Sequence, residues 1–323
     1  MTTAPADILF KPTRTDLSEF GAAPVVVVGM PRSGSSFMSH LLSQFPDYYV
    51  FDDLYTIPKS RELKLSSPLT AQDLDKILHF LGWQIRARLR FGLYAIPNIK
   101  DEEVDVMNSA LKQAFVEKPG SVLDLQREWL HRLAARSSAR KWGFKLPKAF
   151  LYSEELRAQY PDLKVVVLLR QPNDVLASYK FIPETSHDGD PGRYHPLFYA
   201  IYWRLAAKHA LRLQRDHPDS TLFIPFHDLT KTPEDVAAKI GTFLDQPTPE
   251  KINLPERPNS SHSGDGQRKE ITGLEAWLVN VICGSLIERL GFKRRKASIK
   301  ISDIPDFFRT TVTFVRFRLF KPK

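Results

Sequence analysis

Apolar residues in this chain gather into short β-branched runs, and these runs alternate with segments of helical periodicity. The runs at 25–28 and 164–170 are the most apolar, and they are typical of strands that are covered on both faces. Shorter runs predict three further strands at 48–51, 141–145 and 221–225. Because helical segments separate the strands, the pattern predicts an α/β fold with a parallel sheet flanked by helices.

The stretch from about 58 to 140 shows only helical spacing, with apolar residues three and four positions apart. We interpret it as a helical insertion over the binding site, which either shapes a pocket or only packs. Further helices are expected at 154–160, 197–217, 234–244 and 274–290, and a loop at 227–234 in which Thr232 caps the next helix. The composition of residues 181–196 predicts a loop, and that of residues 255–270 predicts a polar, mobile segment.

A glycine loop, Gly29-Met-Pro-Arg-Ser-Gly34-Ser-Ser36, follows the first strand and leads into a helix. The spacing of its glycines matches a P-loop, in which backbone N–H groups and the positive end of the helix meet at an anion. Ser35 stands where an NTPase has lysine, which disfavours ATP or GTP hydrolysis. The alternative is a plain glycine turn between a strand and a helix.

The loop sequence P-R-S-G-S-S resembles the 5′-phosphosulfate loop of sulfotransferases that use 3′-phosphoadenosine 5′-phosphosulfate (PAPS). This resemblance implies a P-loop-type fold and a sulfuryl-transfer activity, with PAPS as the co-substrate. It covers roughly residues 24–58 and 141–292, and it leaves the helical insertion and the tail uncovered. The loop residues that it assigns to PAPS binding are Arg32, Ser33, Gly34, Ser35 and Ser36.

A second segment, R-Q-P-N-D-V-L-A-S, begins at the end of a predicted strand. It resembles the 3′-phosphate segment of the same family, which implies that Arg170 and Ser178 bind that phosphate. A guanidinium and a hydroxyl at such positions can hold one phosphate, because arginine offers a bidentate fork. Taken alone, Arg170 would be interpreted as part of a surface ion pair.

The segment F-P-D-Y-Y-V-F-D-D-L-Y-T-I-P resembles a stretch of tyrosylprotein sulfotransferases that carries a glutamate pair. The resemblance makes Asp52 the base that takes the proton of the acceptor, with Asp53 at the second position. Since neighbouring residues of a strand point to opposite faces, we expect only one of them to face the site. The alternative is that both carboxylates cap a turn or the following helix.

Lys145, in G-F-K-L-P, resembles the lysine of the K-D-P or K-T-P segment in tyrosylprotein and bacterial sulfotransferases, although Leu146 replaces a polar residue. Transfer of a sulfuryl group needs positive charge at the leaving phosphate. The resemblance implies that Lys145 and Arg32 supply this charge, so that no metal is required. The alternative for Lys145 is a solvated lysine at the end of a strand.

Cytosolic small-molecule sulfotransferases use histidine as the base, and this leaves a second hypothesis open. The rival candidates are His187 and His195, although a lone loop histidine is more often simply exposed. Arg268 and Lys269 could close over the 3′-phosphate, as a basic loop does in cytosolic members, but a solvated loop is the default interpretation.

Charge is uneven along the 323 residues, since the chain from Gly291 onward carries +8 of the net +9. The nearly neutral body gives no indication of nucleic-acid binding. The tail, 293–323, mixes phenylalanine with arginine, which suits a helix or strand in contact with a membrane surface. The alternative is a segment docked on the body, with arginines that reach water.

Composition sets the broad class of protein. An apolar share of 42% supports a folded core, which we expect as one domain over 1–292. Cys283 is the single cysteine, so an internal disulfide is excluded and a buried packing role is expected. The chain shows no apolar run of transmembrane length and no signal-peptide pattern, and we expect a cytoplasmic protein.

The resemblance therefore implies metal-free, in-line transfer of a sulfuryl group from PAPS to a hydroxyl, in preference to an amine. The acceptor would be a small molecule, a carbohydrate or a lipid, and neither its identity nor the oligomeric state is predicted. Two alternative hypotheses are a Mg²⁺-dependent P-loop kinase of small molecules and a non-catalytic protein that binds PAP (3′-phosphoadenosine 5′-phosphate) or another nucleotide. The tail raises a third alternative, a scaffold that is recruited to a membrane.

Overall fold

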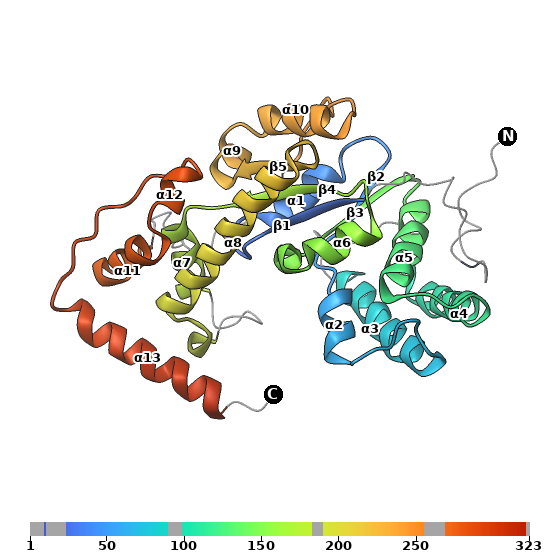
Figure 1. The fold of residues 1–323 in the computed structure, drawn as a ribbon, viewed down its shortest axis with the longest axis horizontal. Coiled ribbons are helices and arrows are strands. Elements are labelled where there is room, and N and C mark those ends of the chain that lie inside the picture. The colour runs from blue at the N-terminus through green and yellow to red at the C-terminus, as the bar shows by residue number, and fades with distance from the viewer. Residues whose placement is uncertain (1–9, 11–23, 90–98, 183–189, 255–268, 321–323) are drawn as a thin grey trace. The chain divides into compact units, whose positions relative to one another are not determined.

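The computed structural model describes residues 10, 24–89, 99–182, 190–254 and 269–320. A five-stranded parallel sheet with the order β2-β3-β1-β4-β5 is flanked by helices (Figure 1). This confirms the predicted fold class, and each predicted strand is present to within one residue. The strands are β1 (Val25–Gly29), β2 (Tyr48–Phe51), β3 (Lys141–Lys145), β4 (Lys164–Leu169) and β5 (Thr221–Pro225).

The helices occupy most of the remaining described chain. The α-helices are α1 (Ser35–Leu42), α2 (Thr56–Glu62), α3 (Ala71–Leu89), α4 (Asp101–Glu117), α5 (Val122–Arg136), α6 (Ser153–Gln159), α7 (Pro172–Lys180), α8 (Pro196–Asp216), α9 (Phe226–Lys231), α10 (Pro233–Leu244), α11 (Gly273–Cys283), α12 (Leu286–Arg289) and α13 (Asp303–Phe320). Short 3₁₀ segments are η4 (Pro147–Tyr152), η5 (Pro191–Arg193) and η6 (Pro218–Ser220). The described part of 58–140 is helical, as predicted.

Two predicted elements are wrong. The expected loop at 227–234 contains helix α9, which buries Leu229 and leaves Thr232 at the N-cap of α10 without a side-chain capping bond. The helix expected over 274–290 is two helices, because Gly284 at φ +51° ends α11. The expected mobility of 255–270 falls almost wholly outside the described residues.

The chain divides into two compact units. Unit 1 comprises Met1–Val28, Ser36–Val166 and Thr232–Pro255, and unit 2 comprises Gly29–Ser35, Val167–Lys231 and Glu256–Lys323. Within unit 1, α3 packs against α4 and α4 against α5, and the ring of Trp129 on α5 meets Phe51 edge-on at 4.9 Å. These contacts form the core of the helical segment.

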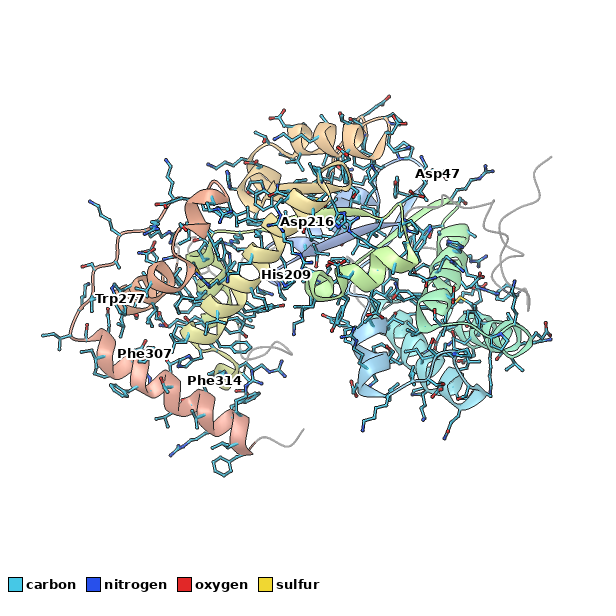
Figure 2. The ribbon with its side chains drawn as sticks, viewed as in Figure 1. Asp47, His209, Asp216, Trp277, Phe307 and Phe314 are labelled. Atoms are coloured by element: carbon cyan, nitrogen blue, oxygen red, sulfur yellow. The ribbon has the colours of Figure 1, made fainter. Side chains whose placement is uncertain are left out.

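Within unit 2, α8 packs along α11 (Figure 2, where His209 lies on α8 and Trp277 on α11). Cys283 at the end of α11 is fully buried, and its thiol donates to the carbonyl of Ala200 over 3.6 Å. Burial raises the pKa of the Cys283 thiol to about 12, so the thiol stays protonated. The prediction of a buried packing role for Cys283 is confirmed.

His131 links the core of unit 1 to the pH dependence of stability. Its ring lies edge-on to Trp142 at 5.0 Å, and burial, assisted by the charge of Arg127, lowers the pKa of His131 from 6.5 to about 3. Between these values the unfolded chain binds a proton that the folded chain does not. The free energy of unfolding should therefore fall as the pH falls below 6.5, by up to about 1.4 kcal/mol per pH unit.

Urea unfolding at about pH 7 and about pH 5 measures this effect. His131→Gln should reduce the loss of stability between the two pH values, whereas His79→Gln, a change at an exposed residue of α3, should leave it unchanged. Equal pH dependence in the wild type and His131→Gln would contradict the assignment.

Candidate active site

The glycine loop in unit 2 has a backbone that only glycine allows at two positions. At Gly29, φ is +143° and an added Cβ would lie 1.9 Å from the carbonyl oxygen of Leu168. At Gly34, φ is +86° and a Cβ would lie 2.3 Å from the ring of Phe226. The two glycines of the motif are thus required by the fold of the loop.

Side chains of the loop lie in different environments. Ser33 is fully buried, and its hydroxyl has no hydrogen-bond partner among the described residues. Ser35 is buried at the start of α1. Arg32, at φ +69°, is exposed, and its Nε donates to the hydroxyl of Ser178 over 3.1 Å. The loop therefore contacts the second predicted segment directly.

Arg170 directly follows β4 and is only 8% exposed. Its guanidinium lies over the ring of Phe226 at 4.8 Å, and its Nε is 4.0 Å from the carboxylate of Asp174. Arg295 reaches the same carboxylate at 2.6 Å. The indole of Trp203 donates to the carbonyl of Arg170 over 2.9 Å. Arg170 is thus held in place from three directions, and a single carboxylate bridges two arginines.

A second group of predicted residues lies within unit 1, at the ends of β2 and β3. Lys145 is 2% exposed, and its Nζ lies 3.1 Å from Asp52 and 2.5 Å from Asp53. The prediction that only one carboxylate could face the site is wrong, because β2 ends at Phe51 and Asp53 has a φ of +56°. The alternative of a solvated Lys145 is wrong for the same contacts.

Asp52 is fixed by helix α1 as well as by the lysine. Its Oδ1 accepts from the hydroxyl of Ser39 over 2.6 Å, and its Oδ2 accepts from Ser36 over 3.3 Å. The alternative that the two carboxylates cap the next helix is not supported, since α2 begins after Tyr55 with no side-chain cap. Asp52 therefore has three donors around it and is the less exposed carboxylate, at 9% against 25% for Asp53.

Several residues that contact the predicted site residues were not identified from the sequence. Ser39 lies three positions after Ser36 on α1, so helical spacing could have placed both on one face. Asp174 is four positions after Arg170, which is a recognisable ion-pair spacing. Phe226 carries no signal in the sequence, since its role comes from a contact with a loop almost 200 positions earlier. Tertiary packing alone defines it.

The rival histidine His195 has a packing role in the structure. It is buried, its Nε2 lies 3.1 Å from the hydroxyl of Thr311, and burial lowers the pKa of His195 against the opposing charge of Glu275. His187 and Arg268 lie outside the described residues. Lys269 is exposed, with its Nζ 5.5 Å from the ring centre of Phe181. The hypothesis of a basic loop stays a prediction.

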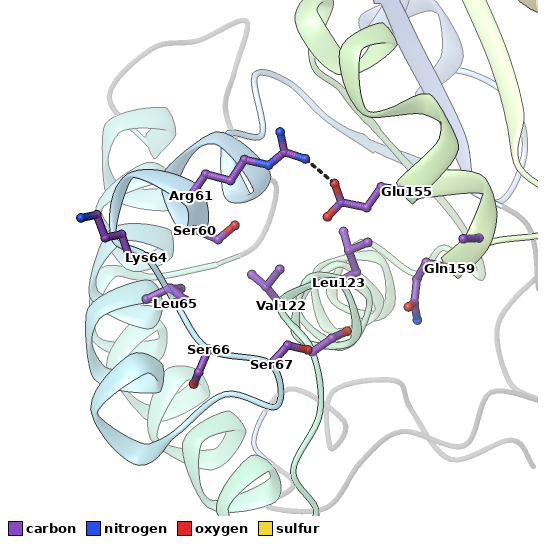
Figure 3. Close-up of a pocket in the computed structure, with 12 residues that line it drawn as sticks. Ser60, Arg61, Lys64, Leu65, Ser66, Ser67, Val122, Leu123, Glu155 and Gln159 are labelled. Atoms are coloured by element: carbon purple, nitrogen blue, oxygen red, sulfur yellow. Dashed lines mark hydrogen bonds and ion pairs between the residues drawn. The ribbon is translucent and has the colours of Figure 1, made fainter.

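A cavity of about 480 Å³ lies within unit 1 between α2, the start of α5 and α6 (Figure 3). Arg61 and Glu155 form an ion pair of 2.7 Å beside it, and the guanidinium of Arg61 lies 4.4 Å from the ring centre of Tyr152. The residues that line it include none of the predicted site residues. Across the described ranges, no group of three or more His, Cys, Asp or Glu is placed to hold a metal ion.

A parallel sheet with a glycine loop between its central strand and the next helix defines an α/β protein of the P-loop type. A profile described as "Sulfotransferase family" matches residues 24–250, which is well over half of the chain. The chain therefore belongs to the sulfotransferase family, and its general activity is sulfotransfer. No curated protein matches the chain.

Solved structures give further similarities. The sulfotransferase domain of the Synechococcus PCC 7002 olefin synthase is 18% identical over 94% of this chain and 97% of its own, with a TM-score of 0.47. The sulfotransferase domain from the curacin biosynthetic pathway is 16% identical over 94% of this chain and 100% of its own, with a TM-score of 0.49. A mouse sulfotransferase complexed with PAP is 11% identical over 98% and 90%, with a TM-score of 0.33.

The buried lysine between two carboxylates leads to a stability prediction. Lys145→Met should lower the free energy of unfolding by about 3 to 5 kcal/mol, because it leaves two carboxylates close together without a cation. The double variant Lys145→Met/Asp52→Asn should regain part of that loss. Urea unfolding of the wild type, both single variants and the double variant measures this coupling.

The same approach provides a control and an outcome that would contradict the prediction. Asp53→Asn, at the more exposed carboxylate, should cost less than Lys145→Met. If the losses in the free energy of unfolding caused by Lys145→Met and Asp52→Asn simply add in the double variant, the lysine and Asp52 do not interact.

Proposed function

We propose that the chain transfers a sulfuryl group from PAPS to a hydroxyl of its acceptor and needs no metal ion. The observation that carries the proposal is the hydrogen bond from Arg32 to Ser178. It joins the two segments whose sequences resemble the 5′-phosphosulfate loop and the 3′-phosphate segment of the family, although 146 positions separate them. PAPS carries phosphate groups at both of these ends.

The residues present fit such a ligand. The buried hydroxyl of Ser33 still lacks a partner among the described residues, and the positive φ of Gly34 lets the loop backbone turn beside Phe226. Arg32 and Arg170 supply positive charge, and a guanidinium can donate two parallel hydrogen bonds to a phosphate. In this proposal the loop from Arg32 to Ser36 holds the 5′ end, while Arg170 and Ser178 hold the 3′-phosphate.

When bound, PAPS supplies the sulfuryl group and leaves as PAP. Asp52 accepts the proton of the acceptor hydroxyl, and its donors Ser39, Ser36 and Lys145 hold the carboxylate in one orientation. Ser36 directly follows Ser35 in the chain, so the residue that orients Asp52 continues the loop. Lys145 and Arg32 stabilise the negative charge that develops on the leaving phosphate oxygen, which is the role a metal ion plays in kinases.

The proposed acceptor is a hydroxyl on a small molecule, a carbohydrate or a lipid. A cytoplasmic location is part of the same proposal. The chain has one cysteine, which is buried and has no partner for a disulfide within the chain, and this suits a reducing compartment.

Calorimetric titration with PAP in EDTA tests the nucleotide. The wild type should bind PAP tightly without metal, and Arg170→Ala should weaken binding about 10- to 100-fold, since a charge-assisted contact contributes about 1.5 to 3 kcal/mol. Arg212→Ala, at an exposed arginine of α8, is the matched control and should bind as the wild type does.

The other hypotheses give different titrations. Binding of Mg·ATP in place of PAP would overturn the proposal in favour of a kinase. Tight PAP binding combined with no transfer from radiolabelled PAPS to any hydroxyl acceptor would favour a non-catalytic nucleotide-binding protein.

The base assignment is tested separately by kinetics. Asp52→Asn should lower kcat about 100-fold or more while the affinity for PAP stays within about twofold, because general bases typically contribute a factor of that size. Asp53→Asn should have the smaller effect on kcat. A larger effect at Asp53 than at Asp52 would move the role of base to Asp53.

A further inference from the structure

Helix α13 has an inner face that is fixed to unit 2. Phe307 and Phe314 (Figure 2) pack against the ring of His195, with ring centres 5.6 and 5.1 Å away. A Cβ on Gly192 of η5 would lie 2.5 Å from the Cβ of Phe317, so the two backbones approach closely. Asp306 accepts from Lys180 over 3.1 Å. The helix is thus anchored along its length and presents a fixed outer face.

The outer face of α13 is apolar. Five residues that are 45% to 69% exposed follow each other at steps of four, four, three and four positions: Ile304, Phe308, Val312, Val315 and Leu319. At about 100° per residue they fall within about 80° of each other, so they form one continuous stripe. Ile299 and Ile301, just before the helix, are exposed as well. An exposed apolar stripe of this length marks an interaction surface.

Cations flank this apolar stripe on both sides. By helix geometry Arg309 and Arg316 lie along one edge of it and Arg318 along the other. After Asp306 the sequence has five basic residues and no acidic one, and Asp306 itself contacts Lys180 and Arg309. The combination of an apolar stripe and cationic edges complements a surface that is apolar inside and anionic outside.

From this charge pattern we infer that α13 docks on anionic lipid bilayers, with the stripe among the acyl chains and the arginines at the headgroups. A second copy of the chain is the less suitable partner, because two such helices would bring cationic edges together. None of the helices in the described ranges is long and apolar enough to cross a membrane, so the contact is one of surface docking. The inference does not depend on PAPS.

Flotation of the full chain with vesicles tests this surface. The wild type should bind vesicles of phosphatidylcholine with phosphatidylserine, bind pure phosphatidylcholine far less, and lose binding at high salt. Phe308→Gln/Leu319→Gln should lower the partition coefficient about tenfold or more, since both side chains are exposed and would enter the bilayer. Arg316→Gln should lower it about fivefold, which corresponds to about 1 kcal/mol.

The matched control is Val106→Gln/Val116→Gln, which changes two comparably exposed apolar residues on α4 and should bind vesicles as the wild type does. Circular dichroism and thermal unfolding confirm that each variant is folded. Wild type that binds neither vesicle, or a Phe308/Leu319 variant that binds as well as the wild type, overturns the inference. The inference is also overturned if sedimentation shows a concentration-dependent dimer that is abolished only in the Phe308/Leu319 variant.

Discussion

The close approach of Gly29 to Leu168 is the constraint on which the glycine loop of unit 2 depends. The carbonyl of Leu168 occupies the place where any side chain at Gly29 would begin. Gly29 is three residues before Arg32, and Leu168 is two residues before Arg170. The contact therefore holds the two segments together just before both arginines, and the Nε of Arg32 donates to Ser178 in the same unit. A larger residue at Gly29 would separate the two segments.

Buried charge needs a different explanation in unit 1. Lys145 and Asp52 lie almost out of water, and buried ion pairs are in general no more stable than well-packed apolar residues. The hydroxyls of Ser36 and Ser39 on α1 and the ammonium of Lys145 on β3 contact Asp52. Lys145 also contacts Asp53, whose backbone is left-handed. An arrangement that costs desolvation and backbone freedom is the kind of preorganisation that the proposed role of Asp52 as a base would require.

Strands were the most predictable part of the fold, because valine runs such as Val25–Val28 leave little alternative to a buried strand. The two motifs that contain Arg32 and Ser178 were recognisable in the sequence, and their roles at a nucleotide stay predictions. What the sequence could not show depends on distant contacts. Helix α9 begins at Phe226, which packs on Gly34 and Arg170, and the burial of Lys145 depends on a turn after β2. Neither has a local signature.

The tail shows why two interpretations of one sequence need not exclude each other. In the sequence alone, docking on the body and contact with lipid are alternatives, because the sequence does not separate the arginines and phenylalanines of the tail by face. In a helix they separate by face, since Phe307 and Phe314 pack against His195 while Phe308 points to solvent. The inner face anchors the helix to unit 2, and an anchored helix presents its outer side chains with less conformational entropy to lose on binding. Anchoring on the body is thus what would make an apolar stripe of five residues an effective lipid contact.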